Sequence, residues 1–448
     1  MKKWQEMPYS VLDSDDSTAH RHVMLRLFGA VLPISYVWLL PLLASESIGF
    51  AHRCPTYPQC VQTGTSVSNY ICTPSATGMM YACFFYPCLH AWFNVRALGA
   101  WNVEKLTVVT FQVLFNLFLM FPLIYVRHEH SAVVSLFALT GLGHFCIVES
   151  HCVQEMRKTV RVLIATAMAS FLGVGCCAAI ATIDKHWLPI HAPHLFYLFE
   201  ATGLTSIVLL TLLWKGKEWQ AHKTVKRSHT GEWYLRLAVT CVPVFYLCLL
   251  IPLSAPAIGF GHRCEGWPRC DLFGATLSDF IRTPEATGAM GAVFFYPCLH
   301  AWLNVHDAVR HSPIDLRAAK VTVVAFQATF GLNLGLANYS SYWVWRLPQA
   351  FFAVFAIAHL IIMLRLCHDT RRFHMWLCAS CVTVTFTALL ILTVVGHSNP
   401  TLLPEHAPYL YFVLEVIGYS VVAVAPAFFY VDEEALIARN RANGNSLS

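Results

Sequence analysis

The stretch Phe84-Phe-Tyr-Pro-Cys-Leu-His-Ala-Trp92 occurs twice in this chain, the second time without change as Phe294 to Trp302. A second motif, Ile48-Gly-Phe-Ala-His-Arg-Cys54, recurs at the same offset of 210 residues as Ile258-Gly-Phe-Gly-His-Arg-Cys264. After a five-residue insertion the offset becomes 215 and then holds for Thr107 and Thr322, Gln112 and Gln327, His144 and His359, Cys152 and Cys367, His191 and His406, Glu200 and Glu415, and Gly203 and Gly418. A register kept over this length indicates a tandem duplication of one unit.

The composition is that of a membrane protein. Apolar residues make up 56% of the 448 positions and charged residues only 12%, against roughly 25% charged in soluble domains. Apolar runs of about 20 residues, long enough to cross a bilayer, recur along the whole chain. They predict an all-α polytopic protein with about twelve spans, at 23–45, 74–95, 106–126, 131–152, 160–182, 194–214, 235–255, 284–305, 318–337, 344–366, 374–395 and 408–430.

Each half contains six predicted spans, so both copies insert the same way up and form a parallel repeat with a pseudo-two-fold axis along the membrane normal. The predicted organisation is a tail (1–22), a first repeat (23–214), a basic linker (215–234), a second repeat (235–430) and a second tail (431–448). Most Lys and Arg residues lie on the side of the tails and linker, which places both termini in the cytoplasm. The net charge of +5 is spread between spans, and no nucleic-acid partner is expected.

The loop after the first span of each half contains a cysteine pair, Cys54 and Cys60 in the first copy and Cys264 and Cys270 in the second. The orientation puts these loops in an oxidising compartment, so we expect a disulfide within each. Two free thiols are an alternative. Zinc binding with help from Cys72 is a weaker one, because the second copy has another residue at that position, and no metal site is predicted.

Polar side chains inside spans are costly and are therefore candidates for function. His90, Gln112 and His144 are expected at a similar depth in the cytoplasmic half of the membrane, with Asn94 one turn from His90. The second copy repeats them as His300, Asn304, Gln327 and His359. Three interpretations are open: hydrogen bonds between helices, a site for a lipid headgroup or substrate, and axial ligation of haem.

Glu200 and Glu415 lie near the non-cytoplasmic end of the sixth span of each half, nine residues after His191 and His406. A carboxylate two turns inside a span must be protonated, paired or in contact with water. We therefore predict that each Glu and its His line a polar recess open to the lumen, as a lipid- or substrate-binding site. The alternative is that a neighbouring helix caps each Glu, which then serves folding alone.

Several of these features together resemble the Frag/DRAM/Sfk superfamily: six spans per unit, a Cys-containing luminal loop with Ser68-Asn69 or Ser278-Asp279, Gly-Leu-Gly-His144 in the fourth span, and His-x8-Glu with a following Gly at the sixth. The resemblance implies an endomembrane protein, of the Golgi or ER or of the lysosome, that handles or senses phospholipids or GPI-anchored substrates in GPI-anchor lipid remodelling. The chain departs from the family pattern in having two units, and in having Asn69 where an Asp is expected.

Two other functional classes remain open. Paired six-span halves also suit a small-solute transporter, and a b-type electron carrier would use His90 and His144 as haem ligands. No nucleophile elbow, phosphate-binding loop or zinc-hydrolase signature is present in the sequence. Catalytic residues are therefore unknown, no cofactor is predicted, and the oligomeric state and the occurrence of a reaction are left undetermined.

Overall fold

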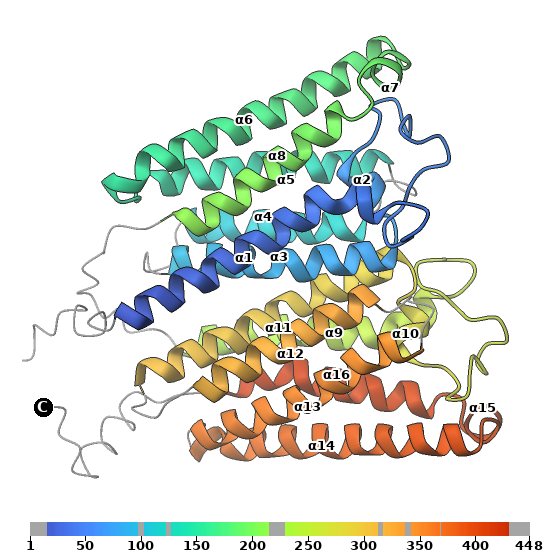
Figure 1. Cartoon of the computed structure of the whole chain (residues 1–448). Coiled ribbons are helices and arrows are strands. Elements are labelled where there is room, and N and C mark those ends of the chain that lie inside the picture. Colours follow the sequence, from blue (N-terminus) through green and yellow to red (C-terminus); the bar gives the residue numbers. More distant parts are fainter. Residues whose placement is uncertain are drawn as a thin grey trace, which may run out of the picture.

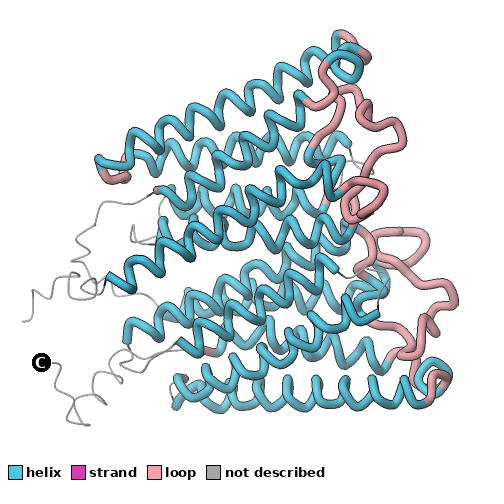
Figure 2. Tube along the Cα trace, viewed as in Figure 1, coloured by secondary structure: helices cyan, strands magenta, loops and turns pink. Residues whose placement is uncertain are grey.

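The structure is a computed structural model that describes residues 16–96, 103–121, 127–214, 229–311, 317–336, 342–367 and 369–429. Most of the predicted N-terminal tail, most of the predicted linker and the predicted C-terminal tail lie outside these residues. The described parts of the chain contain helices and loops but no β-strand (Figure 2).

The long helices run roughly side by side in two sets (Figure 1). The first set comprises α1 (Asp16–Leu43), α2 (Val67–Tyr70), α3 (Pro74–Arg96), α4 (Val103–Met120), α5 (Arg127–Glu149), α6 (Gln154–Ile183), α7 (Trp187–His191) and α8 (Leu195–Leu213). The second comprises α9 (His229–Leu253), α10 (Leu277–Phe280), α11 (Pro284–His311), α12 (Arg317–Leu336), α13 (Tyr342–Leu366), α14 (Asp369–Ser398), α15 (Leu402–His406) and α16 (Leu410–Phe428).

Nine helices in the described ranges are long and apolar enough to cross a membrane: α4, α5, α6, α8, α9, α12, α13, α14 and α16. Large apolar side chains are exposed on the outer helices, as Leu172 on α6 (67%) and Leu390 on α14 (65%) illustrate. Burial in lipid removes the penalty that water would impose on such a surface. The chain is therefore an all-α integral membrane protein, as its composition predicted.

Each predicted span overlaps a long helix, but the ends differ. α1 begins at Asp16, inside the predicted tail, and α14 begins at Asp369, five residues before the predicted span. Hydropathy marks where a helix meets lipid, whereas the helix itself continues as far as backbone hydrogen bonds allow. The short helices α2, α7, α10 and α15 were not predicted, because four or five residues carry too little periodicity to be recognised.

The long helices of the second set have the same long-helix neighbours within their set as those of the first. For example, α4 packs on α5 as α12 does on α13, and α6 packs on α8 as α14 does on α16. The two sets meet where α3 contacts α11 and α12, and where α11 contacts α4.

Contacts between the sets are reciprocal. Phe85 and Phe295, which occupy the same place in the repeated motif, touch edge to face with ring centroids 5.6 Å apart. A Cβ atom on Gly78 would lie 2.5 Å from the backbone of Leu334, and one on Gly288 would lie 2.2 Å from that of Leu119. The missing side chains allow two pairs of helices to approach closely at equivalent places, as in a self-complementary interface.

Candidate functional site at the loop end

Two long loops lie at one end of the molecule, which we call the loop end (Figure 1). The first loop (44–73) connects α1 to α3 and contains α2, and the second loop (254–283) connects α9 to α11 and contains α10. Disulfides join Cys54 to Cys60 and Cys264 to Cys270, with Cα atoms 5.4 Å apart in each. The predicted disulfides are thereby confirmed, and their sulfur atoms are not available to bind zinc.

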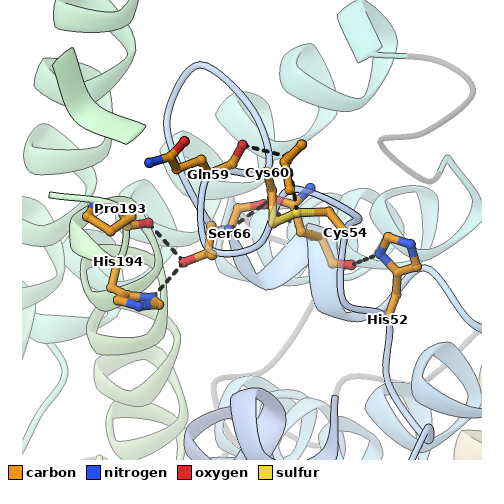
Figure 3. The surroundings of a disulfide bond; sticks show 10 residues. His52, Cys54, Gln59, Cys60, Ser66, Pro193 and His194 are labelled. Atoms are coloured by element: carbon orange, nitrogen blue, oxygen red, sulfur yellow. Dashed lines mark hydrogen bonds between the residues drawn. A yellow bond between two sulfur atoms is a disulfide. The ribbon is translucent and has the colours of Figure 1, made fainter. Parts of the chain in front are cut away.

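The first loop is docked onto the turn before α8 (Figure 3). The backbone N–H of Thr65 donates to the carbonyl of Pro193 at 2.7 Å, and its hydroxyl contacts the same carbonyl at 3.1 Å and His194 Nδ1 at 3.2 Å. Gly64 makes this approach possible, because it has φ +79° and a Cβ there would lie 2.2 Å from the Pro193 oxygen. No other residue tolerates both conditions without strain.

α2 begins with a reciprocal capping interaction. The backbone N–H of Asn69 donates to the hydroxyl of Ser66 at 3.1 Å, and the backbone N–H of Ser66 donates to Asn69 Oδ1 at 3.0 Å. The next N–H group, that of Val67, donates to Glu200 Oε2 at 2.7 Å. The carboxylate of α8 thus accepts a hydrogen bond at the start of a helix in the loop, where negative charge is favoured.

The second loop repeats this arrangement. Ala275 N–H donates to the carbonyl of Pro408 at 2.8 Å, and Thr276 with Asp279 caps α10. Leu277 N–H then donates to Glu415 Oε2 at 2.5 Å. Each Glu singled out by the sequence therefore holds the loop of its own half, 133 and 138 residues away in the chain.

The surroundings of the two carboxylates differ. Glu415 also accepts a hydrogen bond from Gln349 and lies 3.8 Å from the guanidinium of Arg346. That guanidinium donates to Gln349 Oε1 at 2.9 Å and to the Tyr411 hydroxyl at 3.2 Å, and it lies over the ring of Phe273, 4.7 Å from its centroid. Planar stacking and several directed hydrogen bonds are the contacts that arginine makes best in a buried site.

Another carboxyl of the second loop lies close to this group. Burial raises the pKa of Asp271 above its ordinary value, and the nearby Asp279 carboxylate adds to the rise. A hydrogen bond from Phe273 N–H and the positive charges of Arg346 and Arg282 oppose the shift. The second half therefore brings two acidic side chains, Asp271 and Asp279, close to the basic side chains of Arg346 and Arg282 at the loop end.

His191 and His406 do not join the carboxylates. Both are exposed at the ends of the short helices α7 and α15, and the described contact of His191 is with the ring of Trp187, at 5.5 Å. Glu200 and Glu415 are only 8% and 0% exposed, so an open recess shared by Glu and His is wrong. The reason is that the loop covers each carboxylate and offers it a backbone N–H.

The polar residues that were expected in the cytoplasmic half of the membrane have hydrogen-bond partners on neighbouring helices. Gln112 and Gln327 donate to the carbonyls of Cys88 and Cys298, both at 2.7 Å. His144 Nδ1 lies 2.9 Å from the Thr107 hydroxyl, and His359 Nδ1 lies 3.2 Å from that of Thr322. These contacts join neighbouring helices pairwise.

The remaining members lie on α3 and α11. Asn94 and Asn304 donate to the carbonyls of Thr211 and Pro426, both at 2.8 Å. His90 lies beside Gly29 of α1, where a Cβ atom would be 3.9 Å from the imidazole ring, and His300 is half-buried. The Asn, Gln and His144 or His359 side chains, which were expected at a similar depth, thus have separate hydrogen-bond partners in each half.

Asn304 and His359 do line one small cavity, of about 20 Å³, together with apolar residues that include Phe326, Met363 and Met375. This volume suffices for one ordered water. Among the described residues, no group of three or more His, Cys, Asp or Glu side chains is placed to hold a metal ion.

Comparison with protein-family models, with curated proteins and with solved structures gave no match. Function is therefore inferred from the chemistry of the loop end.

Sequence reasoning did not single out Arg346, nor the three side chains that surround it: Gln349, Tyr411 and Phe273. Arg346 and Gln349 stand three residues apart at the start of an apolar run. This spacing puts both on one helix face, a signal that was available. The partners Val67 and Leu277 could not have been found, because each contributes only a backbone N–H group.

Proposed function

We propose that this chain is a lipid-handling protein of the endomembrane system that takes part in the lipid remodelling of GPI anchors. The observation that carries the proposal is the pair of buried carboxylates, Glu200 and Glu415, each under a disulfide-closed loop in the second turn of an apolar helix. In the proposed orientation, the second turn of a span would lie near the level of the lipid headgroups. The resemblance to the Frag/DRAM/Sfk superfamily supplies the substrate class.

The proposed architecture is twelve spans in two parallel six-helix repeats, with both termini in the cytoplasm and the loop end in the lumen. It is supported by the matching helix neighbours of the two sets and by the reciprocal contacts of Gly78 and Gly288. In this orientation the two disulfides lie in the compartment where disulfides persist. Golgi, ER or lysosomal membranes all meet that condition.

The proposed chemistry is recognition rather than bond cleavage. A carboxylate held at a fixed depth can select a headgroup by charge, and the loop above it excludes bulk water, which strengthens the interaction. Two hydroxyl groups of the first loop do contact imidazoles, Thr65 with His194 and Ser68 with His130. Both hydroxyl side chains are buried, with 0% and 3% exposure, so neither is open to attack a substrate. A separate enzyme would then carry out the transfer of acyl chains.

The test is lipid analysis in cells that lack the protein. Mass spectrometry of GPI-anchored proteins should find anchors with unremodelled lipid chains, and the wild-type chain should restore the normal lipid. The double variant Glu200→Gln and Glu415→Gln should reach its membrane but fail to restore it, because Gln keeps the hydrogen-bond acceptor and removes the charge.

Leu172→Ala, on the lipid-facing surface of α6, is the matched control and should restore remodelling fully. Normal anchor lipids in the cells without the protein would refute the proposed function. Full rescue by the double variant at normal protein levels would refute the role of the carboxylates.

A further inference from the structure

The two buried carboxylates accept equivalent backbone hydrogen bonds, from Val67 and Leu277, but among the described residues only Glu415 has a cation beside it. Glu415 is fully buried and faces Arg346 and Gln349. Glu200 accepts one hydrogen bond, from Val67 N–H to Oε2. Among the described residues no Lys, Arg or His forms an ion pair with Glu200, and none of them donates a hydrogen bond to its other oxygen, Oε1.

This difference extends to every residue that surrounds the guanidinium. In the register of the repeat, the first half has Ser131 for Arg346, Val134 for Gln349, Phe196 for Tyr411 and Thr63 for Phe273. The first half has thus kept the carboxylate and lost the complete set of groups that neutralises it. A buried charge without a counter-charge costs several kcal/mol, so Glu200 must either be protonated or be neutralised by a cation from elsewhere.

Aromatic rings stand beside Glu200. Tyr197, one turn earlier on α8, shares its helix face, and its ring meets that of Tyr70 edge to face with centroids 5.3 Å apart. Both rings are buried, and the Tyr197 hydroxyl is already engaged with the carbonyl of Val37. A carboxylate next to tyrosine rings is a favourable environment for an organic ammonium ion. Glu200 retains 8% exposure, whereas Glu415 retains none.

We propose that Glu200 binds a primary ammonium group through Oε1, and that Arg346 occupies the equivalent position in the second half as a built-in cation. The inference deepens the proposed function, on which it rests, by assigning headgroup binding to the first half alone. A primary ammonium donates hydrogen bonds that a quaternary choline group cannot. Its source is either a lipid headgroup containing ethanolamine or a soluble amine such as free ethanolamine.

The experiment uses the purified full-length protein in nanodiscs. Thermal unfolding is followed in phosphatidylcholine alone and with added phosphatidylethanolamine, and separately in phosphatidylcholine with increasing free ethanolamine. The wild type should unfold at a higher temperature when the primary amine is present. Stabilisation by the lipid but not by free ethanolamine identifies a site for the lipid headgroup. Stabilisation by both identifies a site that soluble amines can also reach.

Glu200→Gln should lose this stabilisation, with apparent affinity for the amine reduced about tenfold or more, as loss of a charged hydrogen bond implies. Leu172→Ala, on the outer surface of α6, is the matched control and should keep the amine-dependent increment. Ser131→Arg places an arginine at the position equivalent to Arg346 and should also abolish the increment while Glu200 remains.

An increment that persists in Glu200→Gln, or one that is absent from the wild type with both amines, would overturn the proposal. If Glu200→Gln does not fold, the Ser131→Arg variant provides the test. A stabilisation by the amine as large in Ser131→Arg as in the wild type would also overturn the proposal. Binding is measured without reference to GPI anchors. If Glu200→Gln loses the increment and cells that lack the protein nevertheless have normal anchor lipids, the remodelling function is rejected and the ammonium site stands.

Discussion

At the residue scale, the loop end shows two solutions for one buried carboxylate. Glu200 and Glu415 both accept a hydrogen bond from an N–H group at the start of a short helix, which favours negative charge. In the described parts of the chain only Glu415 also has an arginine beside it, and Arg346 is itself 8% exposed. A buried ion pair of this kind contributes little net stability, but removal of one partner leaves a costly charge behind.

Replacing Arg346 with Met should destabilise the protein by roughly 3–5 kcal/mol, because Glu415 then has no counter-charge. Arg346→Met combined with Glu415→Gln should recover most of the loss. Unfolding of the detergent-solubilised protein, followed by denaturant titration, measures both. A double variant no more stable than Arg346→Met alone would contradict the ion-pair explanation.

At the element scale, the two sets of helices depend on close approach between α3 and α12 and between α11 and α4. Gly78 and Gly288 are the residues that permit it, since a Cβ atom on either would overlap the backbone of the facing helix. Two turns further along α3 and α11, Phe85 and Phe295 pack against each other with ring centroids 5.6 Å apart.

Gly78→Ala and Gly288→Ala should each lower the free energy of unfolding by about 1–3 kcal/mol, the usual cost of overpacking. Gly175→Ala on α6 is the matched control, since a Cβ atom there meets nothing within 4 Å. That substitution should be neutral or stabilising by up to about 1 kcal/mol, as expected for Gly to Ala in a helix. Equal effects of all three in thermal unfolding would contradict the packing role of Gly78 and Gly288.

The loops are elements in their own right. Proteolysis of the unreduced protein should recover Cys54 linked to Cys60 and Cys264 linked to Cys270. Cys72, which belongs to neither disulfide and donates to the Ser68 carbonyl, should be alkylated after unfolding. Replacing Cys54 and Cys60 with Ser should cost about 2 kcal/mol, as the short closed loop implies. Recovery of all four cysteines as free thiols would contradict this pairing in the cell.

At the scale of the whole molecule, the proposed orientation puts the loop end on the non-cytoplasmic side. Epitope tags at either terminus should be reached by antibodies only after the plasma membrane is permeabilised. A tag inserted in the first loop should remain protected until the internal membranes are also opened. A terminal tag on the same side as the loop tag would refute the even number of spans in each half.

Several features could be predicted from the sequence because they depend on local pattern. Apolar runs predicted the helices, and the place of Cys54 and Cys60 in a loop expected on the non-cytoplasmic side predicted their disulfide. The repeat register also identified Glu200, Gln112 and His144 as interior polar residues, and all three are buried. Each of these inferences needs only the chemistry of a residue and its distance along the chain.

Other features were decided by tertiary structure alone. The hydrogen-bond donors to Glu200 and Glu415 include backbone N–H groups of the loops, which have no residue signature, so the sequence suggested His191 and His406 in their place. The separate partners of Gln112 and His144 depend on the rotation of each helix about its axis. Depth in the membrane follows from position in the sequence, but which side chains meet is determined by packing between helices, where side chains far apart in the chain compete for the same space.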